Sequence, residues 1–165
     1  MKYLLVLLSL LSSFALASPD FVRGEAVVYR VIDGDTFTLN VTSGLDYNEL
    51  KSFGVESGSE RYFNDKYQSF RVRLANVDTE ESVHSDPSRN TEFGKLTSRY
   101  VKELIEGESV GYMCWDFGKY DRAICSLALK GQDLGYLLIS EGYSDYVTRY
   151  GRHPYLHKEY SSYRD

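Results

Sequence analysis

The sequence has few cysteines and no excess of positive charge, and both absences limit what the protein can be. It contains 2 Cys and 3 His in 165 residues. Two Cys with no nearby His provide too few ligands for a zinc site. The chain carries 19 Lys and Arg against 24 Asp and Glu, a formal net charge of −5. Bulk attraction to a polyanion is therefore excluded, and any such binding must come from a local cluster of Arg and Lys, helped by a bound cation.

Long hydrophobic runs are absent after the first residues. Lys2 precedes an almost wholly apolar or Ser segment at 3–14, and residues 15–17 (Ala-Leu-Ala) have the small-x-small pattern of a cleavage site. This run falls short of the ~20 residues that a membrane-spanning helix needs. We predict a signal peptide at 1–17, a mature chain from Ser18 that is secreted or periplasmic, and no stable membrane insertion after cleavage.

The two cysteines, Cys114 and Cys125, each lie in an apolar, strand-like run, with a polar turn between the runs. This arrangement suits a cross-strand disulfide within one hairpin. The alternative is two separate buried thiols. Because export leads to an oxidising compartment, we predict the disulfide.

Hydrophobic periodicity predicts one α+β domain at 18–165, mainly β, with five strands and about three helices. Short strands with interleaved helices fit a small closed barrel that has helices packed outside it. Between strands two and three, residues 42–68 show no sustained period and contain several Gly and Ser, which predicts a long, mobile loop. The predicted strands are 25–31, 35–41, 69–77, 110–115 and 122–129, and the predicted helices are 91–106, one from Asp133 to Gly142, and one starting at Pro154.

The segment VIDGDTF at 31–37 places two carboxylates and a hydroxyl around one glycine, between strand-like residues. Asp and Thr offer hard oxygen atoms, the ligand type that calcium and magnesium select. On its own, Asp-Gly more often marks an ordinary hairpin turn, with Asp33 and Asp35 as turn residues.

Two later segments strengthen the functional interpretation. RLANVDTEE at 73–81 and KYDR at 119–122 add further carboxylates and two arginines, Arg73 and Arg122. Carboxylates for a metal and guanidiniums for a phosphate are what a phosphodiester-cleaving site requires. Each residue also has a simpler reading: Arg73 as a solvated strand residue, for example, or Arg122 paired with a neighbouring Asp.

Four motifs, in this order along the chain, resemble the thermonuclease (staphylococcal-nuclease-like) family: VIDGDTF, FRVRLANVDTEE, EFGKLTSRYVKELI and KYDRAICSL. The resemblance covers roughly residues 24–150. It implies an OB-fold barrel of five strands with packed helices. It also implies a calcium-dependent endo- and exonuclease that acts on DNA and RNA and leaves 3′-phosphates.

The resemblance also implies a role for each acidic site residue. Asp35 and Asp78 match the carboxylates that hold Ca²⁺, and Thr79 matches the residue that lends its backbone carbonyl. Glu81 matches the carboxylate that orients or deprotonates the attacking water. The chain has Glu80 where the family usually has Pro, so that either glutamate could face the metal, and we choose Glu81 by register.

The remaining roles fall on basic and aromatic residues. Arg73 and Arg122 match the two guanidiniums that clamp the phosphate. Lys119, Tyr120 and Tyr150 match positions that line the nucleotide site.

Several ring-bearing residues receive no catalytic role. We place His84, His153 and His157 at the surface, because none forms a ligand-like pair, and we expect Trp115 to pack rather than to stack on a base. Tyr146 is either a second nucleotide-flanking tyrosine or a core residue.

The sequence is compatible with three functions. The first is the metal-dependent nuclease with DNA and RNA as substrates, acting as a monomer. The second is a non-catalytic nucleic-acid-binding OB-fold module, and the third is an exported barrel that binds carbohydrate or protein through its 15 Tyr. The presence of Asp35, Asp78, Glu81, Arg73 and Arg122 favours the nuclease.

Overall fold

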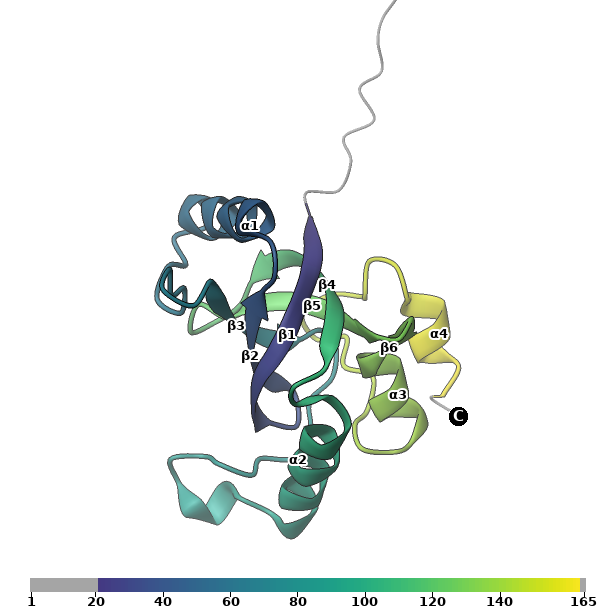
Figure 1. Ribbon diagram of the computed structural model, residues 1–165. Coiled ribbons are helices and arrows are strands. Elements are labelled where there is room, and N and C mark those ends of the chain that lie inside the picture. Colours follow the sequence, from purple (N-terminus) through teal and green to yellow (C-terminus); the bar gives the residue numbers. More distant parts are fainter. Residues whose placement is uncertain (1–20, 164–165) are drawn as a thin grey trace, which may run out of the picture.

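The computed structural model describes residues 21–163, so the predicted signal peptide at 1–17 and the predicted mature start at Ser18 lie outside the described residues. Six strands form a sheet in the order β3-β2-β1-β4-β5-β6, and β3 also pairs in parallel with β5. That pairing closes β1 to β5 into a barrel (Figure 1), which confirms the predicted mainly β, α+β fold class with an OB-type barrel. The strands are β1 (Val22–Asp33), β2 (Thr36–Val41), β3 (Ser69–Leu74), β4 (Ser109–Phe117), β5 (Ala123–Leu129) and β6 (Gln132–Asp133).

The strand β1 is long enough to pair with two neighbouring strands. Its first half pairs with β4 and most of its length pairs with β2. The β1–β2 register shifts between Val28 and Arg30 and again between Val31 and Asp33. Such bulges bend a strand and increase its twist, which helps a small sheet to close. The second shift lies directly before the turn that carries Asp35.

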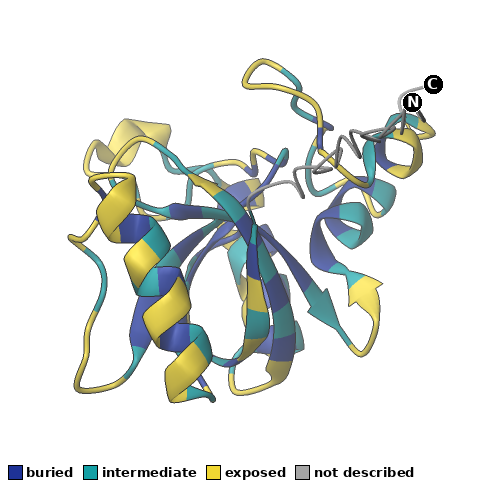
Figure 2. Ribbon diagram, turned by 90° about the horizontal axis from the view of Figure 1, so that it is seen from above, coloured by how far each residue is buried: buried dark blue, intermediate teal, exposed yellow. Residues whose placement is uncertain are grey.

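The barrel core comes from alternating residues of the strands. On β2 and β3, Phe37, Leu39, Phe70 and Val72 point inward and are almost fully buried. Buried residues follow the strands, whereas exposed residues gather on the outer faces of helices and on loops (Figure 2). Alternation along a strand places the next residues on the opposite face of the sheet. This outer face carries Thr36, Thr38, Arg71 and Arg73.

The helix α2 (Glu92–Ile105) packs against β1 and has Thr91 as its N-cap, whose side chain accepts a hydrogen bond from Gly94 N. Asp133 caps α3 (Leu134–Ser140) in the same way, as the sequence predicts. A short 3₁₀ helix, η1 (Pro87–Arg89), precedes α2. The helix α4 (His157–Ser161) begins three residues after the predicted start at Pro154. Within 21–163, none of the helices is long and apolar enough to cross a membrane.

The predicted loop at 42–68 is wrong for its first half, because residues Gly44–Glu56 form the helix α1. Ser43 is its N-cap and accepts a hydrogen bond from Asp46 N. Only Tyr47, Leu50 and Gly54 are buried, so the apolar side of the helix is too sparse to show a clear period. The following residues, 57–68, form turns and one isolated bridge to β3.

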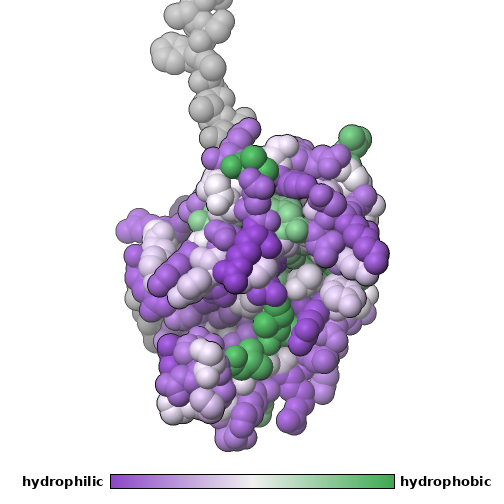
Figure 3. Space-filling view, turned by 90° about the vertical axis from the view of Figure 1, so that its left-hand side faces the viewer, coloured by the Kyte–Doolittle hydropathy of each residue, from purple (hydrophilic) through white to green (hydrophobic). Residues whose placement is uncertain are grey.

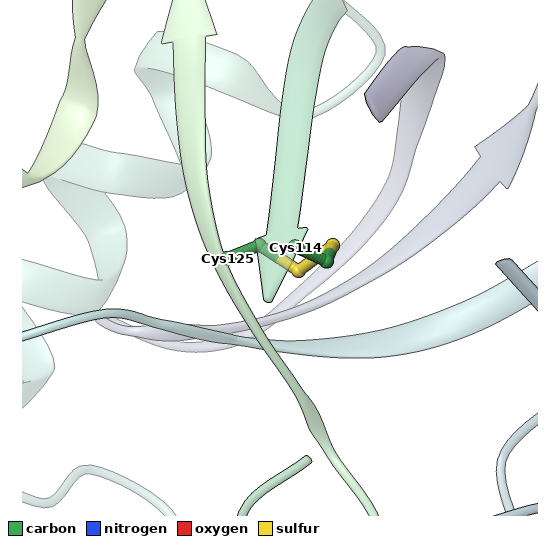
Figure 4. Close-up of a disulfide and its surroundings, with 2 residues drawn as sticks. All are labelled: Cys114 and Cys125. Atoms are coloured by element: carbon green, nitrogen blue, oxygen red, sulfur yellow. A yellow bond between two sulfur atoms is a disulfide. The ribbon is translucent and has the colours of Figure 1, made fainter. Parts of the chain in front are cut away.

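The predicted disulfide is confirmed. Cys114 of β4 and Cys125 of β5 are directly opposite in the register, with Cα atoms 4.0 Å apart, and their sulfur atoms are bonded (Figure 4). Both residues are fully buried inside the barrel. The bond therefore joins two neighbouring strands of the core.

The surface prediction is wrong for His153, which is 1% exposed. Its Nδ1 accepts hydrogen bonds from the backbone N–H groups of Tyr155 and Leu156, so Nε2 carries the proton and donates to Ser126 Oγ at 2.7 Å. Trp115 packs edge-on against the ring, as expected of a packing residue. The chain after α3 is thereby fixed to β5. His84 and His157 are partly exposed.

Stability should depend on pH through His153. Burial lowers the pKa of His153 below its ordinary value of 6.5. The unfolded chain then binds the proton more readily than the folded one, so the free energy of unfolding should fall as the pH drops below 6.5, by at most about 1.4 kcal/mol per pH unit. Urea unfolding at several pH values would measure this. His153→Asn should have a shallower slope and His157→Asn should keep it; equal slopes in all three proteins would contradict the assignment.

Candidate active site

Three separate segments meet on the outer face of the barrel, and the strand pairing explains why. Thr36 of β2 is opposite Arg73 of β3, so the β1–β2 turn with Asp35 lies beside Arg73. In the parallel pair, Arg73 is opposite Ile124 of β5, which follows Arg122 closely in the chain. The sheet thus brings the three predicted motifs together at one edge of the barrel.

Arg73 is the centre of this cluster. One guanidinium nitrogen, Nη1, is ion-paired with Asp35, and Nη2 lies 2.7 Å from Asp78 Oδ1. The Arg73 side chain is only 17% exposed. Two carboxylates from different segments therefore converge on a single positive charge.

Asp35 is buried, and its oxygen atoms have several partners. Oδ2 accepts hydrogen bonds from the Thr79 backbone N–H at 3.1 Å and from Thr79 Oγ1 at 3.2 Å, and Oδ1 accepts one from Thr36 Oγ1. Burial raises the pKa of Asp35, against the opposing effects of Arg73 and the Thr79 backbone hydrogen bond. The glycine of the motif is required here, because a Cβ on Gly34 would lie 2.7 Å from Thr79 Oγ1.

Asp33, the other carboxylate of VIDGDTF, has a different role. Its Oδ1 accepts hydrogen bonds from Gly34 N at 2.8 Å and from the hydroxyls of Ser82 and Ser98 at 2.7 Å. Ser98 belongs to α2. Asp33 therefore fixes the turn to the helix, and Asp35 is the residue that faces the cluster.

The two adjacent glutamates point to different places. Glu80 Oε2 accepts a short hydrogen bond, 2.5 Å, from the hydroxyl of Thr91 at the start of α2. Burial raises the pKa of Glu81, and the negative charges of Asp33 and Asp35 raise it further. Glu80 is thus engaged at the start of α2, and Glu81 as the glutamate that faces the metal stays a prediction.

The position of Glu81 depends on a close approach of α2. A Cβ on Gly94 would clash with the Glu81 carbonyl oxygen, so only glycine allows the helix to come so near. The Thr91 backbone N–H also donates to that carbonyl, at 3.0 Å. The EFGKL motif at the start of α2 thus holds the segment that carries Glu81.

Arg122 lies beside the same cluster. Its Nη1 donates to Thr36 Oγ1 at 3.0 Å. Burial lowers the pKa of Arg122 and the nearby charge of Arg73 lowers it further, whereas Asp35 and Glu81 raise it. Arg122 therefore adds a second, partly buried guanidinium to a cluster that also holds the carboxylates of Asp35 and Asp78. A guanidinium offers a planar set of donors that matches phosphate oxygens.

The sequence did not single out Arg149, which lies 2.7 Å from Asp78 Oδ2. The side chain of Asn76 holds this part of the chain in place. Asn76 follows β3 closely and has φ of 59°. Its side-chain amide donates hydrogen bonds to the backbone carbonyls of Val147 and Gly151. Those bonds fasten the segment around Arg149 against the end of β3. The only sequence signal was its position beside a predicted nucleotide-site residue.

The predicted nucleotide-lining residues are exposed rather than joined to the cluster. Tyr120 is 58% exposed and Tyr150 is 87% exposed. Lys119 Nζ lies 5.0 Å from the centroid of the Tyr120 ring, and the Arg149 guanidinium lies 5.0 Å from the centroid of the Tyr150 ring. No hydrogen bond or ion pair links Lys119, Tyr120 or Tyr150 to the carboxylates within the described part of the chain. Tyr146 is a core residue, only 5% exposed.

The donor set fits a hard dication, although no group of three or more His, Cys, Asp or Glu among residues 21–163 is arranged around a single point. Asp35 and Asp78 already converge on one cation, the Arg73 guanidinium. Carboxylate oxygens are ligands that calcium accepts in irregular geometry. The two carboxylates could therefore hold a calcium ion together with backbone and water oxygens.

Comparison with protein families matches residues 71–165 to the staphylococcal nuclease homologue family. The chain belongs to this family. Its members are generally nucleases, which are hydrolases that act on nucleic acids. Comparison with curated proteins finds no significant match. The matched span includes Arg73, Asp78, Glu81 and Arg122, whereas Asp35 lies before it and is joined to it through the β2–β3 pairing.

Proposed function

We propose that this protein is an exported, calcium-dependent nuclease that hydrolyses phosphodiester bonds of DNA and RNA. One observation carries the proposal. Asp35 and Asp78 converge on Arg73 while Arg122 lies alongside, so that acidic and basic groups from three segments share one small site. Partly buried charges of this kind add little to the stability of a folded protein, so a functional role explains them better than a purely structural one.

The residues divide the chemistry between them. When held by Asp35 and Asp78, calcium would supply positive charge that offsets the repulsion between the phosphodiester anion and the hydroxide character of the attacking water as it loses its proton. Glu81 accepts the proton of that water, and its raised pKa suits a general base. The backbone carbonyl of Thr79 would add a further oxygen ligand.

Bond making and bond breaking follow from this arrangement. The water oxygen bonds to phosphorus and the bond from phosphorus to the 5′-oxygen breaks. The 5′-oxygen leaves as an alkoxide and takes up a proton from solvent to give a 5′-hydroxyl, and the phosphate stays on the 3′-oxygen. Arg73 and Arg122 donate hydrogen bonds to the phosphoryl oxygens as negative charge builds on them. Lys119, Tyr120 and Tyr150 contact the nucleotide at the rim.

Glu81→Gln tests the proposal. The substitution keeps the size of the side chain but removes the base, so the cleavage rate should fall on the order of 10²–10⁴-fold. The measurement is the cleavage of end-labelled single-stranded DNA and RNA in calcium, with the product ends identified by phosphatase treatment. Glu80→Gln is the matched control and should keep most of the activity.

The same assay separates the nuclease from the binding module. If the wild type binds the labelled strand but does not cleave it in calcium, the protein is a binding module. If Glu80→Gln rather than Glu81→Gln loses activity, the assignment of the base is wrong.

Export remains a prediction from the first 17 residues, and the disulfide between Cys114 and Cys125 supports it, because such bonds persist in oxidising compartments. The intact mass of protein purified from its natural compartment would test it. A chain beginning near Ser18 is expected.

A further inference from the structure

A polar hollow of about 230 Å³ opens on the outer face of the barrel, along the strands that carry the candidate site. Its floor is formed by Thr38 of β2 and by Ser69 and Arg71 of β3. Its wall is the turn segment that follows α1, with Arg61, Tyr62 and Asn64. Figure 3 views the molecule from the side on which α1 lies in Figure 1, where the surface is predominantly hydrophilic.

The wall is held firmly in place. Phe63 stacks on Phe70 of the barrel, with ring centroids 6.2 Å apart, and also contacts Phe117 at the end of β4. At the far side, Ser59 Oγ lies 3.5 Å from Asp121 in the turn between β4 and β5. The segment is thus held at Ser59 to the turn before Arg122 and at Phe63 to the barrel core.

Positive charge without a partner collects in this hollow. The Arg71 guanidinium lies 4.0 Å from the centroid of the Tyr62 ring, and that of Arg61 lies 5.2 Å from it. The Nε of Arg71 is buried without a hydrogen-bond partner, and neither arginine forms an ion pair with any described residue. The residues lining the hollow include no acidic side chain among those described.

Two acidic residues, Glu60 and Asp65, lie in the segment that forms the wall, and neither is ion-paired with Arg61 or Arg71 among the described residues. Asp65 is ion-paired with Lys51 at 2.7 Å and accepts a hydrogen bond from the Tyr47 hydroxyl at 2.9 Å. Arg71 is partly exposed, with its Nε buried and unpartnered, and Arg61 is exposed, so both guanidiniums are open to an anion in the hollow. Planar guanidiniums match phosphate oxygens well.

The hollow is in line with the candidate site. Arg71 and Arg73 are two residues apart on one face of β3, which corresponds to about 7 Å along the strand. Their partners on β2, Thr38 and Thr36, are spaced in the same way. A strand of nucleic acid with one phosphate at Arg73 would therefore have a neighbouring phosphate near Arg71.

We propose that this hollow is a second phosphate subsite, in which Arg71 and Arg61 hold a neighbouring phosphate of the same polynucleotide strand. The proposal rests on the proposed function, because it assumes that the cleaved phosphate lies at Arg73. It gives the segment inserted between β2 and β3 a role: it supplies one wall of an extended groove. The substrate class that follows is an oligonucleotide strand with several phosphates rather than a single phosphodiester.

Binding measured without cleavage tests this subsite. Fluorescence anisotropy in a calcium chelator, with a labelled dinucleotide and a labelled single-stranded hexanucleotide, would compare the wild type with Arg71→Gln and Arg61→Gln. We expect Arg71→Gln to weaken hexanucleotide binding about tenfold, to leave the dinucleotide nearly unchanged, and to lower the salt slope by about 0.7 to 1. Arg23→Gln, which removes the same charge from an exposed position on β1, is the matched control and should behave like the wild type.

The outcomes are distinguishable. Arg61 is exposed, so Arg61→Gln should fold normally and still show a smaller loss, whatever Arg71→Gln does to stability. Unchanged hexanucleotide binding in both variants, or equal losses for both ligands, would overturn the subsite while leaving the proposed function intact. Absence of hexanucleotide binding by the wild type in the chelator would overturn the subsite alone, because Arg71 and Arg61 hold their phosphate without calcium. If the wild type does not cleave the hexanucleotide in calcium, the proposed function fails and the subsite with it.

Discussion

Replacing Asp35 with asparagine should abolish calcium-dependent cleavage and lower calcium affinity on the order of 100-fold or more. Changing a group that merely supports a metal ligand typically costs 10–100-fold in affinity, so loss of a direct carboxylate ligand should cost at least that much. Asparagine is preferred to alanine because Asp35 is buried and accepts hydrogen bonds from Thr36 and Thr79. Asn keeps the shape of the side chain and one oxygen, which can still accept the two hydrogen bonds from Thr79. Isothermal titration with calcium, combined with the cleavage rate, measures both effects.

Asp78→Asn should behave similarly, since Asp78 is the other carboxylate that converges on Arg73. Asp116→Asn is the matched control: Asp116 is exposed on β4, and its only hydrogen bond among described residues is to the backbone N–H of Phe117. Full calcium-dependent cleavage by a folded Asp35→Asn protein would rule out this metal assignment.

Arg73→Lys should lower kcat on the order of 100-fold or more while changing the Kd for a single-stranded oligonucleotide much less. Lysine keeps the charge but loses the planar fork that binds two phosphoryl oxygens as negative charge develops. Single-turnover cleavage gives the rate, and anisotropy in a chelator gives the Kd. Arg23→Lys provides the control for an arginine outside the site.

The structure adds a second expectation for this variant. Arg73 bridges Asp35 and Asp78, so lysine would also reach only one of the two carboxylates at a time. Unfolding by urea should therefore be checked beside the rate. A folded variant with unchanged kcat would show that Arg73 does not stabilise the transition state.

Much of the fold could be predicted because the strands follow clear alternation. Phe70, Val72 and Leu74 face the core while Arg71 and Arg73 face outward, and this pattern is visible in the sequence alone. The helix α1 was not visible, because it buries few residues and because Ser43-Gly44 reads as a break although Ser43 caps the helix. A sparse apolar face with a good cap is a weak signal for a periodicity argument.

The candidate site was predictable as a set of residue types but not as a set of contacts. Residue types alone could not separate Asp33 from Asp35, and only the family resemblance assigned the metal to Asp35. In the structure the two differ because Ser82 and Ser98 donate hydrogen bonds to Asp33. Nor could the sequence show that the Thr91 hydroxyl donates a hydrogen bond to Glu80. Arg149 reaches Asp78 only because Asn76 fixes a distant segment. Each of these contacts joins segments far apart in the chain, which no local pattern records.

The same limit explains His153. Its neighbours in the sequence gave no sign of burial, because the residues that enclose it, Trp115 and Ser126 among them, come from the β4–β5 hairpin. Long-range packing decided its environment.

The most direct test of the central claim is cleavage of an end-labelled single-stranded oligonucleotide by the purified protein beginning at Ser18. We predict cleavage in calcium, none in a calcium chelator, and full recovery when calcium is restored, with products that carry 3′-phosphates. Undiminished cleavage in the chelator, or binding of the strand without cleavage at any calcium concentration, would contradict the account.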